Sequence, residues 1–268
     1  MMKELISHFN EYLTDLYSKK KINPRLKEAI NYSLLASGKR LRPLLFFTIL
    51  QSFGREENKK NFAPAAAIEM VHTYSLIHDD LPAMDNDNLR RGKPTNHVVF
   101  GEDLAILAGD ALLTDAFWVI AESEFSSQQK ANFSRSLAQA AGSLNMVSGQ
   151  VEDLLMNQAN DLAIKQMHYH KTAAMFVAAG EFAAIALELD AIKTKALKDF
   201  AANFGMAFQL ADDLADFKSE ADDSNNFVAD FGVEQSLKTK MDYRQKAFIA
   251  LNQLESPEPL KKFLDLVN

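Results

Sequence analysis

The sequence predicts an all-α protein, and three observations support that prediction. Only 10 Gly and 7 Pro occur in 268 residues, so turn signals are sparse and the segments between them are long. Apolar runs with helical spacing fill these segments, and no alternating run of useful length predicts a strand. Hydrophobic residues make up 47% of the chain, enough for one large core. We therefore expect a single domain over residues 1–268.

The expected helices follow from the residues that interrupt the apolar runs, because Pro and Gly end helices or form the turns between them. These interruptions stand at Pro24, Gly38, Pro82, Gly92–Pro94 and Ser126–Ser127. The polar run from Ser219 to Asn226 is the best candidate for a mobile loop. The sequence predicts helices near residues 2–19, 24–37, 40–54, 60–80, 101–124, 127–148, 149–158, 162–171, 172–190, 192–218, 228–239 and 241–265.

Composition excludes several classes of protein. The net charge of −7 argues against a general nucleic-acid binder, which needs a basic face. With no cysteine, the chain has no disulfide, no thiolate metal site and no cysteine nucleophile. The start of the chain has no continuous apolar region typical of a signal peptide. Charges such as Asp110, Asp115 and Glu181 interrupt the most apolar stretches, so we expect no membrane span and a cytoplasmic protein.

Two aspartate-rich clusters each follow an apolar helical run: DDLPAMD, from Asp79 to Asp85, and DDLAD, from Asp212 to Asp216. Gathering carboxylates at the edge of a core is unfavourable unless a cation binds them. Oxygen ligands favour a hard cation such as Mg2+, which usually bridges a few carboxylates to substrate phosphates. Asp212 and Asp216 are four residues apart and share one helix face, with Gln209 one turn earlier. The clusters therefore predict a diphosphate or a similar polyanion as substrate.

The first cluster stands at the end of its helix. Asp79 and Asp80 would lie at the C-terminal pole, where the helix dipole disfavours negative charge, so we do not expect them to serve stability. Pro82 disrupts regular helix, and Asp85 would reach the metal from a turn. The alternative is that such acidic pairs are merely solvated.

Basic residues supply the counterpart of the carboxylates. The segment GKRLRP at residues 38–43 is typical of a helix end followed by a new helix start. Lys39 and Arg42 are three residues apart, so both can point at one anion above a helix N-terminus. Arg90 and Arg91 follow the first cluster, and arginine forks match phosphate oxygens. Each basic pair by itself is more often part of a solvated surface, but the combination favours a phosphate site.

Six segments of the chain carry specific motifs in a fixed order: SGKRLRP at 37–43, EMVHTYSLIHDDLPAMDNDNLRRGKPTNH at 69–97, FGEDLAILAGDALLTDAF at 100–117, SGQVEDL at 148–154, HKTAAMF at 170–176 and GMAFQLADDLADF at 205–217. With these segments the chain resembles the trans-prenyl diphosphate synthase family, and most closely its bacterial farnesyl diphosphate synthases. The resemblance spans roughly residues 25–217. It implies the all-α isoprenoid synthase type I bundle around a central cavity, normally as a homodimer.

The resemblance implies three sets of functional residues. Mg2+ on the allylic diphosphate would be bound from one wall by Asp79, Asp80 and Asp85, and from the opposite wall by Asp212 with Asp213 or Asp216. The allylic substrate would contact Arg90, Lys171, Thr172 and Gln209. Isopentenyl diphosphate would be held by Gly38, Lys39, Arg42, His72 and Arg91.

The resemblance also implies the reaction. Three Mg2+ ions and several cationic side chains would neutralise the departing diphosphate, so that the allylic C–O bond ionises. The double bond of isopentenyl diphosphate would attack the allylic cation. Loss of a proton to the released diphosphate then gives a product that is five carbons longer. From dimethylallyl or geranyl diphosphate, the main product expected is farnesyl diphosphate.

Tyr74 is the candidate for limiting product length. It precedes Asp79 by five residues, about 7.5 Å along a helix. In the family, an aromatic residue here together with the two-residue-longer first Asp motif is associated with a C15 product. An ideal helix turns Tyr74 about 140° away from Asp79, so Ser75 or a partner subunit could share the pocket floor. The alternative is ordinary core packing.

The sequence departs from the family after Phe217. The Gly-Lys pair, the Asp and the Lys-Thr-Tyr expected there are missing, and no basic tail follows FLDLVN. Two further functions therefore stay open: a catalytically weak partner subunit of a heteromeric synthase, and a geranylgeranyl diphosphate synthase. A terpene cyclase on the same fold is a weaker hypothesis, because it would not need Lys39, Arg42 and His72.

The assignment of Arg42 to isopentenyl diphosphate predicts a selective defect. Arg42→Ala should mainly raise the KM for isopentenyl diphosphate, since each lost charge-assisted contact costs about 1.5–3 kcal/mol. Steady-state kinetics with each substrate varied in turn measures the effect. A defect confined to the allylic substrate would contradict the assignment.

Overall fold

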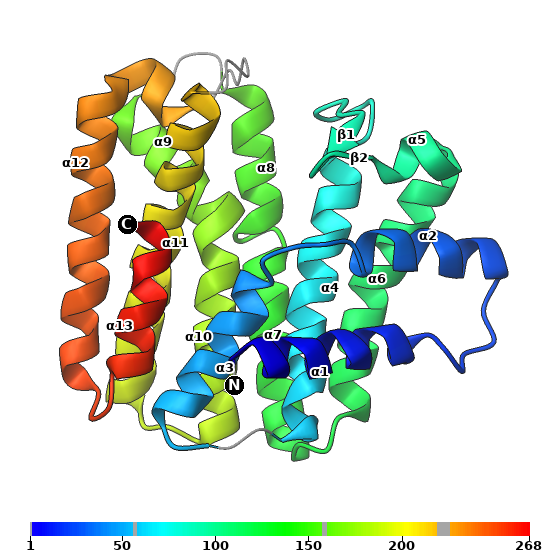
Figure 1. Cartoon of the computed structure of the whole chain (residues 1–268), viewed down its shortest axis with the longest axis horizontal. Coiled ribbons are helices and arrows are strands. Elements are labelled where there is room, and N and C mark those ends of the chain that lie inside the picture. Colours follow the sequence, from blue (N-terminus) through cyan, green and yellow to red (C-terminus); the bar gives the residue numbers. More distant parts are fainter. Residues whose placement is uncertain (1, 56–57, 157–159, 219–225) are drawn as a thin grey trace. The chain divides into compact units, whose positions relative to one another are not determined.

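The computed structural model describes all residues except 1, 56–57, 157–159 and 219–225 (Figure 1). The chain divides into two compact units: the first comprises Met1–Leu44 and Glu57–Lys130, the second Leu45–Glu56 and Ala131–Asn268. The expectation of one domain stays a prediction. Of the expected mobile loop Ser219–Asn226, all but Asn226 lies outside the described residues.

The described residues are almost entirely helical, which confirms the all-α prediction. Two helices, α3 (Leu41–Ser52) and α7 (Ser127–Ala141), begin in the first unit and continue in the second. The other elements of the first unit are α1 (Met2–Leu16), α2 (Pro24–Leu34), the 3-10 turn Lys59–Asn61, α4 (Phe62–Asp79), β1 (Leu89–Arg90), β2 (Lys93–Pro94), α5 (Asn96–Phe100) and α6 (Glu102–Glu122). Those of the second unit are α8 (Met146–Leu155), α9 (Asp161–His168), the π-helical turn Tyr169–Ala173, α10 (Ala174–Leu187), α11 (Ala191–Lys218), α12 (Phe227–Ala250), the 3-10 turn Leu251–Gln253, α13 (Glu258–Leu264) and the 3-10 turn Asp265–Val267.

Several predicted helix boundaries are wrong, and local chemistry explains part of the difference. The helix expected to end near residue 148 ends at Ala141, directly before Gly142. The helix expected to end near residue 239 continues to Ala250. Its interruption lies earlier, at Gly232, which has φ 80° and ψ 162°. Glycine adopts positive φ without steric cost, whereas other residues do not.

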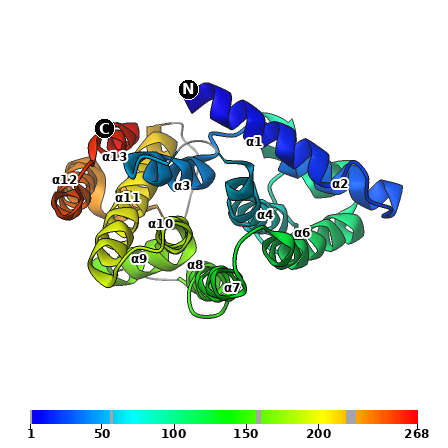
Figure 2. The ribbon, with the colours of Figure 1, turned by 90° about the horizontal axis from the view of Figure 1, so that it is seen from below.

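Small side chains bring α4 and α6 together in the first unit, where the two helices run side by side (Figures 1 and 2). Ala66 and Ala67 on α4 and Ala105 and Ala108 on α6 are all completely buried. Alanines at such positions let two helix backbones approach closely, so that short side chains fill the interface without cavities. Near the end of α4, where the first aspartate cluster lies, the side chain of His78 reaches the backbone carbonyl of Ile106 on α6 at 3.1 Å.

Among the described residues, α6 is long and apolar enough to cross a membrane by length and composition alone. In the structure, 39% of its most apolar 18-residue window is buried. This evidence for a span is weak, because the core helix of a globular protein passes the same test.

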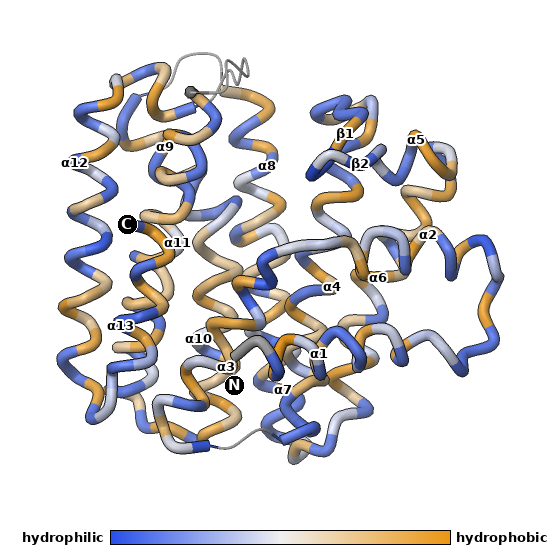
Figure 3. Tube along the Cα trace, in the orientation of Figure 1, coloured by the Kyte–Doolittle hydropathy of each residue, from blue (hydrophilic) through white to orange (hydrophobic). Residues whose placement is uncertain are grey.

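Aromatic rings form much of the core of the second unit. Phe176 on α10 makes an edge-to-face contact with Phe204 on α11, with 5.3 Å between ring centroids. Figure 3 shows hydrophobic residues along most of α10, whereas hydrophilic and hydrophobic residues alternate along α12. The core of this unit therefore forms around α10 and α11, and α12 covers one side of α11.

Asparagine side chains start three of the helices. The side-chain oxygen of Asn23 accepts hydrogen bonds from the backbone N–H groups at the start of α2, where Pro24 occupies the first position. Asn160 caps α9 and Asn226 caps α12 in the same way. These caps satisfy N–H groups that have no partner inside the helix.

A buried ion pair fixes the segment between α2 and α3 in the first unit. Nη1 of Arg40 lies 2.6 Å from Oε1 of Glu69 on α4, and both side chains are 5% exposed. Nη2 of Arg40 also donates to the carbonyls of Leu34 (2.8 Å) and Ala36 (3.0 Å). The guanidinium thus satisfies carbonyls at the end of α2 and holds this connection against α4.

Removing Glu69 should leave the Arg40 charge buried without its carboxylate partner. We expect Glu69→Ala to lower the free energy of unfolding by about 3–5 kcal/mol, the usual cost of breaking a buried pair. The matched control is Glu28→Ala, which breaks the exposed Arg25–Glu28 pair and should cost less than about 1 kcal/mol. Equal losses in denaturant unfolding would show that burial does not matter here.

Candidate functional site

The first aspartate cluster spans the end of α4 and the turn after it. α4 ends at Asp79, and the backbone N–H of Asp85 donates to the carbonyl of Asp79 at 2.9 Å. The turn through Pro82 thus returns Asp85 to the helix end, as the sequence predicts. Asp79 is half-buried and Asp85 is exposed. Two carboxylates six residues apart are therefore joined at one helix end.

Asp80 lies differently from its neighbours in the cluster. It is 3% exposed, and its Oδ1 lies 2.5 Å from Nη2 and 2.6 Å from Nε of Arg90. Burial raises the pKa of the Asp80 carboxyl above its ordinary value, although the ion pair with Arg90 opposes this shift. Asp80 therefore orients Arg90, and a direct metal contact by Asp80 stays a prediction.

Arg90 and Arg91 lie on a short hairpin that the sequence analysis missed. β1 and β2 pair in antiparallel fashion, with Arg90 opposite Lys93. The two residues between them, Arg91 and Gly92, have φ of 55° and 75°, as in the type I′ turn that suits two-residue hairpins. Glycine in the second turn position was the available signal. The hairpin is held against α2 by the Tyr32 hydroxyl, which donates to the Pro94 carbonyl at 2.7 Å.

Gly38 and Arg91 are in direct contact, and this contact corrects the role predicted for the glycine. α2 ends at Leu34, so Gly38 does not end that helix. Instead, Nη1 of Arg91 donates to the carbonyl of Ser37 at 3.0 Å, and a β-carbon at Gly38 would overlap the guanidinium. Both arginines of the hairpin also line a cavity of about 50 Å³. The structure thus brings together Gly38 and Arg91, two residues predicted for isopentenyl diphosphate.

His72 lies close enough to Arg42 and Arg91 for their charges to affect its pKa. Burial lowers the pKa of His72 well below its ordinary value, and the charges of Arg42 and Arg91 lower it further. His72 is therefore a neutral imidazole at neutral pH. Arg42 is 9% exposed in the first turn of α3, and Lys39, just before that helix, is exposed. The first unit thus carries all residues predicted for isopentenyl diphosphate.

Tyr74 and Ser75 lie in the buried part of α4. Tyr74 is 7% exposed, and burial raises the pKa of its hydroxyl to about 12. The Ser75 hydroxyl donates to the carbonyl of His72 at 2.9 Å. Their role in product length stays a prediction.

In the second unit, the three aspartates of the second cluster have different environments. Asp213 is 5% exposed, whereas Asp212 is half-buried and Asp216 is exposed on α11. The spacing of four residues therefore directs Asp212 and Asp216 to the less buried face of the helix, as predicted. Asp213 points into the protein.

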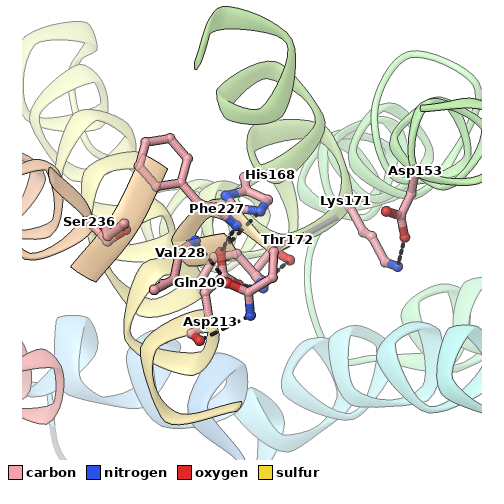
Figure 4. A network of polar contacts seen from close by, with 11 residues as sticks. Asp153, His168, Lys171, Thr172, Gln209, Asp213, Phe227, Val228 and Ser236 are labelled. Carbon is pink, nitrogen blue, oxygen red and sulfur yellow. Dashed lines mark hydrogen bonds and ion pairs between the residues drawn. The ribbon is translucent and has the colours of Figure 1, made fainter. Parts of the chain in front are cut away.

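The carboxylate of Asp213 connects α11 to the start of α12 (Figure 4). Its Oδ1 accepts from Nε2 of Gln209 at 2.9 Å, and its Oδ2 accepts from the backbone N–H of Phe227 at 3.1 Å. Nδ2 of Asn226 donates to the backbone carbonyl of Asp213 at 3.0 Å. These bonds satisfy a buried carboxylate and fix where α12 begins.

His168 adds a neutral group beside Asp213. Its Nε2 lies 3.5 Å from Oδ2 of Asp213, and the side chain is 3% exposed. Burial lowers the pKa of His168 to about 4, so the ring is uncharged at neutral pH. Its buried position beside Asp213 indicates a structural role for this histidine.

Lys171 and Thr172 lie on the π-helical turn Tyr169–Ala173, where the sequence predicts the junction of two helices. Such turns are rare and occur mostly at functional sites. Nζ of Lys171 lies 2.5 Å from Oδ2 of Asp153 on α8, and the Thr172 hydroxyl donates to Oε1 of Gln209 at 2.6 Å (Figure 4). Three residues predicted for the allylic substrate are therefore close together within the second unit.

Two residues of α8 were missed as partners of this turn, although both lie in the segment SGQVEDL. Asp153 pairs with Lys171, and Glu152 lies 2.9 Å from Nδ1 of His170. A β-carbon at Gly149 would overlap the backbone of Lys171. Acidic residues three and four positions after this glycine were the available signal.

The donor set of both clusters fits Mg2+. All candidate ligands are carboxylate oxygens, which this ion prefers. Among the described residues, no three Asp, Glu or His side chains already converge as a metal-binding group. Mg2+ usually completes its shell with water and substrate phosphates rather than with an all-protein cage. In the first cluster, Asp79 and Asp85 are the carboxylates that would hold such an ion, and in the second cluster they are Asp212 and Asp216.

The comparisons with known proteins agree with this chemistry. The family model of polyprenyl synthetase matches residues 23–233. The farnesyl diphosphate synthase of Geobacillus stearothermophilus is 46% identical over 200 residues, 72% of this chain and 67% of that protein. The farnesyl diphosphate synthase of Micrococcus luteus is 40% identical over 271 residues, covering 95% of this chain and 91% of the relative. A solved Helicobacter pylori geranyltransferase complexed with magnesium and isoprenyl diphosphate has a TM-score of 0.88 at 28% identity, over 99% of this chain and 96% of that chain.

The inward position of Asp213 predicts that it serves stability more than its neighbours do. Asp213→Ala should lower the free energy of unfolding by about 1–3 kcal/mol for each donor left unsatisfied. Asp216→Ala is the matched control on the same helix, and its exposed carboxylate should change stability by about 0.5 kcal/mol or less. Chemical denaturation measures both. Equal stability of the two variants would contradict the structural role of Asp213.

Proposed function

Since the chain belongs to the polyprenyl synthetase family, we propose that it is a Mg2+-dependent prenyltransferase with farnesyl diphosphate as its main product. Its substrates are isopentenyl diphosphate and an allylic diphosphate, either dimethylallyl or geranyl diphosphate. The farnesyl diphosphate synthases that match most of this chain support the product.

One observation carries the proposal: both aspartate clusters divide their carboxylates in the same way. In each, one aspartate is buried and bonded to protein, Asp80 to Arg90 and Asp213 to Gln209. The aspartates on either side, at the end of α4 and on α11, are half-buried or exposed. A purely structural cluster would need no such division. Metal binding requires carboxylates at the surface and a rigid support behind them.

The basic residues divide into two sets for the two diphosphates. Isopentenyl diphosphate is bound by Arg91, which lies over Gly38, together with Lys39, Arg42 and the neutral His72. The allylic diphosphate is contacted by Arg90, Lys171, Thr172 and Gln209. Arg90 and Lys171 each have a carboxylate partner, Asp80 and Asp153, which orients the cation before substrate binds.

The reaction follows from neutralising the leaving group. When bound, Mg2+ supplies positive charge to the diphosphate that departs from the allylic carbon. Arg90 and Lys171 also stabilise the negative charge that develops on this diphosphate, so the allylic C–O bond ionises. The double bond of isopentenyl diphosphate then attacks the allylic cation. The released diphosphate accepts the proton. The apolar surroundings keep water from the cation.

Product length is limited by Tyr74, with Ser75 as its neighbour on α4. The Tyr74 ring is 7% exposed; as the floor of the pocket it would stop a growing chain at C15, and a smaller residue there should allow C20. A main product of C20 from the wild-type protein would instead identify a geranylgeranyl diphosphate synthase.

We further propose that the protein works as a homodimer in the cytoplasm. Val98 and Val99 on α5 and Ile106 and Leu107 on α6 are exposed by 43% or more. Exposed apolar side chains on neighbouring elements are typical of protein–protein interfaces. The mass of the assembly in solution tests this proposal.

A second candidate function is a partner subunit of a heteromeric synthase. The sequence after Phe217 favours it, because the lysines expected after the second cluster are absent. A partner subunit would show little turnover by itself and would raise or redirect the activity of a catalytic homologue.

The proposed function predicts Mg2+-dependent condensation that requires both clusters. With isopentenyl and geranyl diphosphate, the protein should make farnesyl diphosphate, and chelation by EDTA should abolish turnover. Asp79→Ala and Asp212→Ala should each lower kcat by orders of magnitude while the circular dichroism of the fold is retained. Chromatography of the dephosphorylated products measures both. Near-normal rates in both variants would refute the metal assignment.

A further inference from the structure

His78 lies between the candidate length-limiting residue and the first aspartate cluster. It follows Tyr74 by four residues on α4, so both side chains share one helix face, and it directly precedes Asp79. The rings of Tyr74 and His78 meet edge to face, with 5.7 Å between centroids and an interplanar angle of 78°. This is the favoured geometry of an aromatic pair.

The imidazole of His78 is fixed on α6. Its Nε2 lies 3.1 Å from the backbone carbonyl of Ile106 and 4.0 Å from Oδ1 of Asp110. Because a carbonyl only accepts hydrogen bonds, Nε2 must carry the proton in this arrangement. His78 therefore donates a hydrogen bond to the backbone of α6, and this bond holds its ring against that helix.

Gly109 makes this position available. A β-carbon built there would overlap three atoms of the His78 ring, Nε2, Cδ2 and Cε1. Gly109 has no positive φ, so its backbone conformation does not require glycine. It is the space taken by the His78 ring that requires glycine at this position.

From these contacts we propose that His78, resting on Gly109, is a positioning residue that sets product length by fixing the ring of Tyr74. The inference rests on the proposed function, in which Tyr74 limits the chain. Helix α4 sets the direction in which the Tyr74 side chain leaves the backbone. The edge-to-face contact with His78 then sets the orientation of the Tyr74 ring. If His78 leaves its place, the Tyr74 ring gains freedom and the pocket deepens.

The test is the ratio of C20 to C15 product with Mg2+, isopentenyl diphosphate and geranyl diphosphate. His78→Ala and Gly109→Ala should each raise this ratio about three- to tenfold, the factor that corresponds to losing one edge-to-face contact. The double variant His78→Ala/Gly109→Ala should match His78→Ala, because the added methyl group then has no ring to displace. Thr114→Ala, an exposed change on the same helix, should leave the ratio unchanged.

Three further variants separate the possible results. Adding His78→Ala to Tyr74→Ala should change nothing beyond Tyr74→Ala, if the effect acts through that ring. His78→Gln keeps a donor for the Ile106 carbonyl without an aromatic ring, and should also raise the ratio. His78→Gln keeps the test decisive if His78→Ala does not fold. If Gly109→Ala does not fold, Gly109→Ser, which places a polar side chain in the same space, replaces it.

The outcomes distinguish this inference from the proposed function. If the wild type makes no prenyl product, the proposed function fails. If Tyr74→Ala lengthens the product while His78→Ala, His78→Gln and Gly109→Ala do not, the proposed function stands and this inference is overturned. Additive effects of His78→Ala and Tyr74→Ala would overturn it as well.

Discussion

Negative charge gathered at the end of a helix is the constraint on which the rest of the site depends. Each cluster places several carboxylates within a few residues, where they repel one another and face an unfavourable helix pole or a buried surface. In each cluster, hydrogen-bond donors of the protein itself bind one carboxylate. Asp80 is held by Arg90 and Asp213 by Gln209 and the N–H of Phe227. The other aspartates of the two clusters are half-buried or exposed, and we propose that these bind the cation.

Those internal bonds also position the groups that we propose contact the substrate. Asp80 aligns Arg90 on its hairpin, and Asp153 aligns Lys171 on the π-helical turn. Gln209 receives the Thr172 hydroxyl while its own amide donates to Asp213. Each cation or polar group is thereby oriented before a diphosphate arrives, which reduces the ordering that binding requires.

Three glycines serve close approach rather than turn formation. Gly38 lies under the guanidinium of Arg91, Gly109 under the ring of His78, and Gly149 against the backbone of Lys171. None of them has positive φ. In each case the missing β-carbon leaves room for a residue in or beside the candidate site. The sequence shows the glycines but not their neighbours, so the end of a helix was the natural but incorrect prediction for Gly38.

The sequence by itself determined the all-α class, most helix positions, the two aspartate clusters and the basic residues that accompany them, because these depend on spacing and residue type along one segment. It determined that Asp212 and Asp216 share a face, since four residues make about one turn of helix. Only the tertiary structure decided that Asp80 and Asp213 point inward, that Arg90 and Arg91 form a hairpin, and that a π-helical turn joins α9 to α10. These features depend on side chains and backbones that are distant in the chain, and local spacing carries no information about which of them meet.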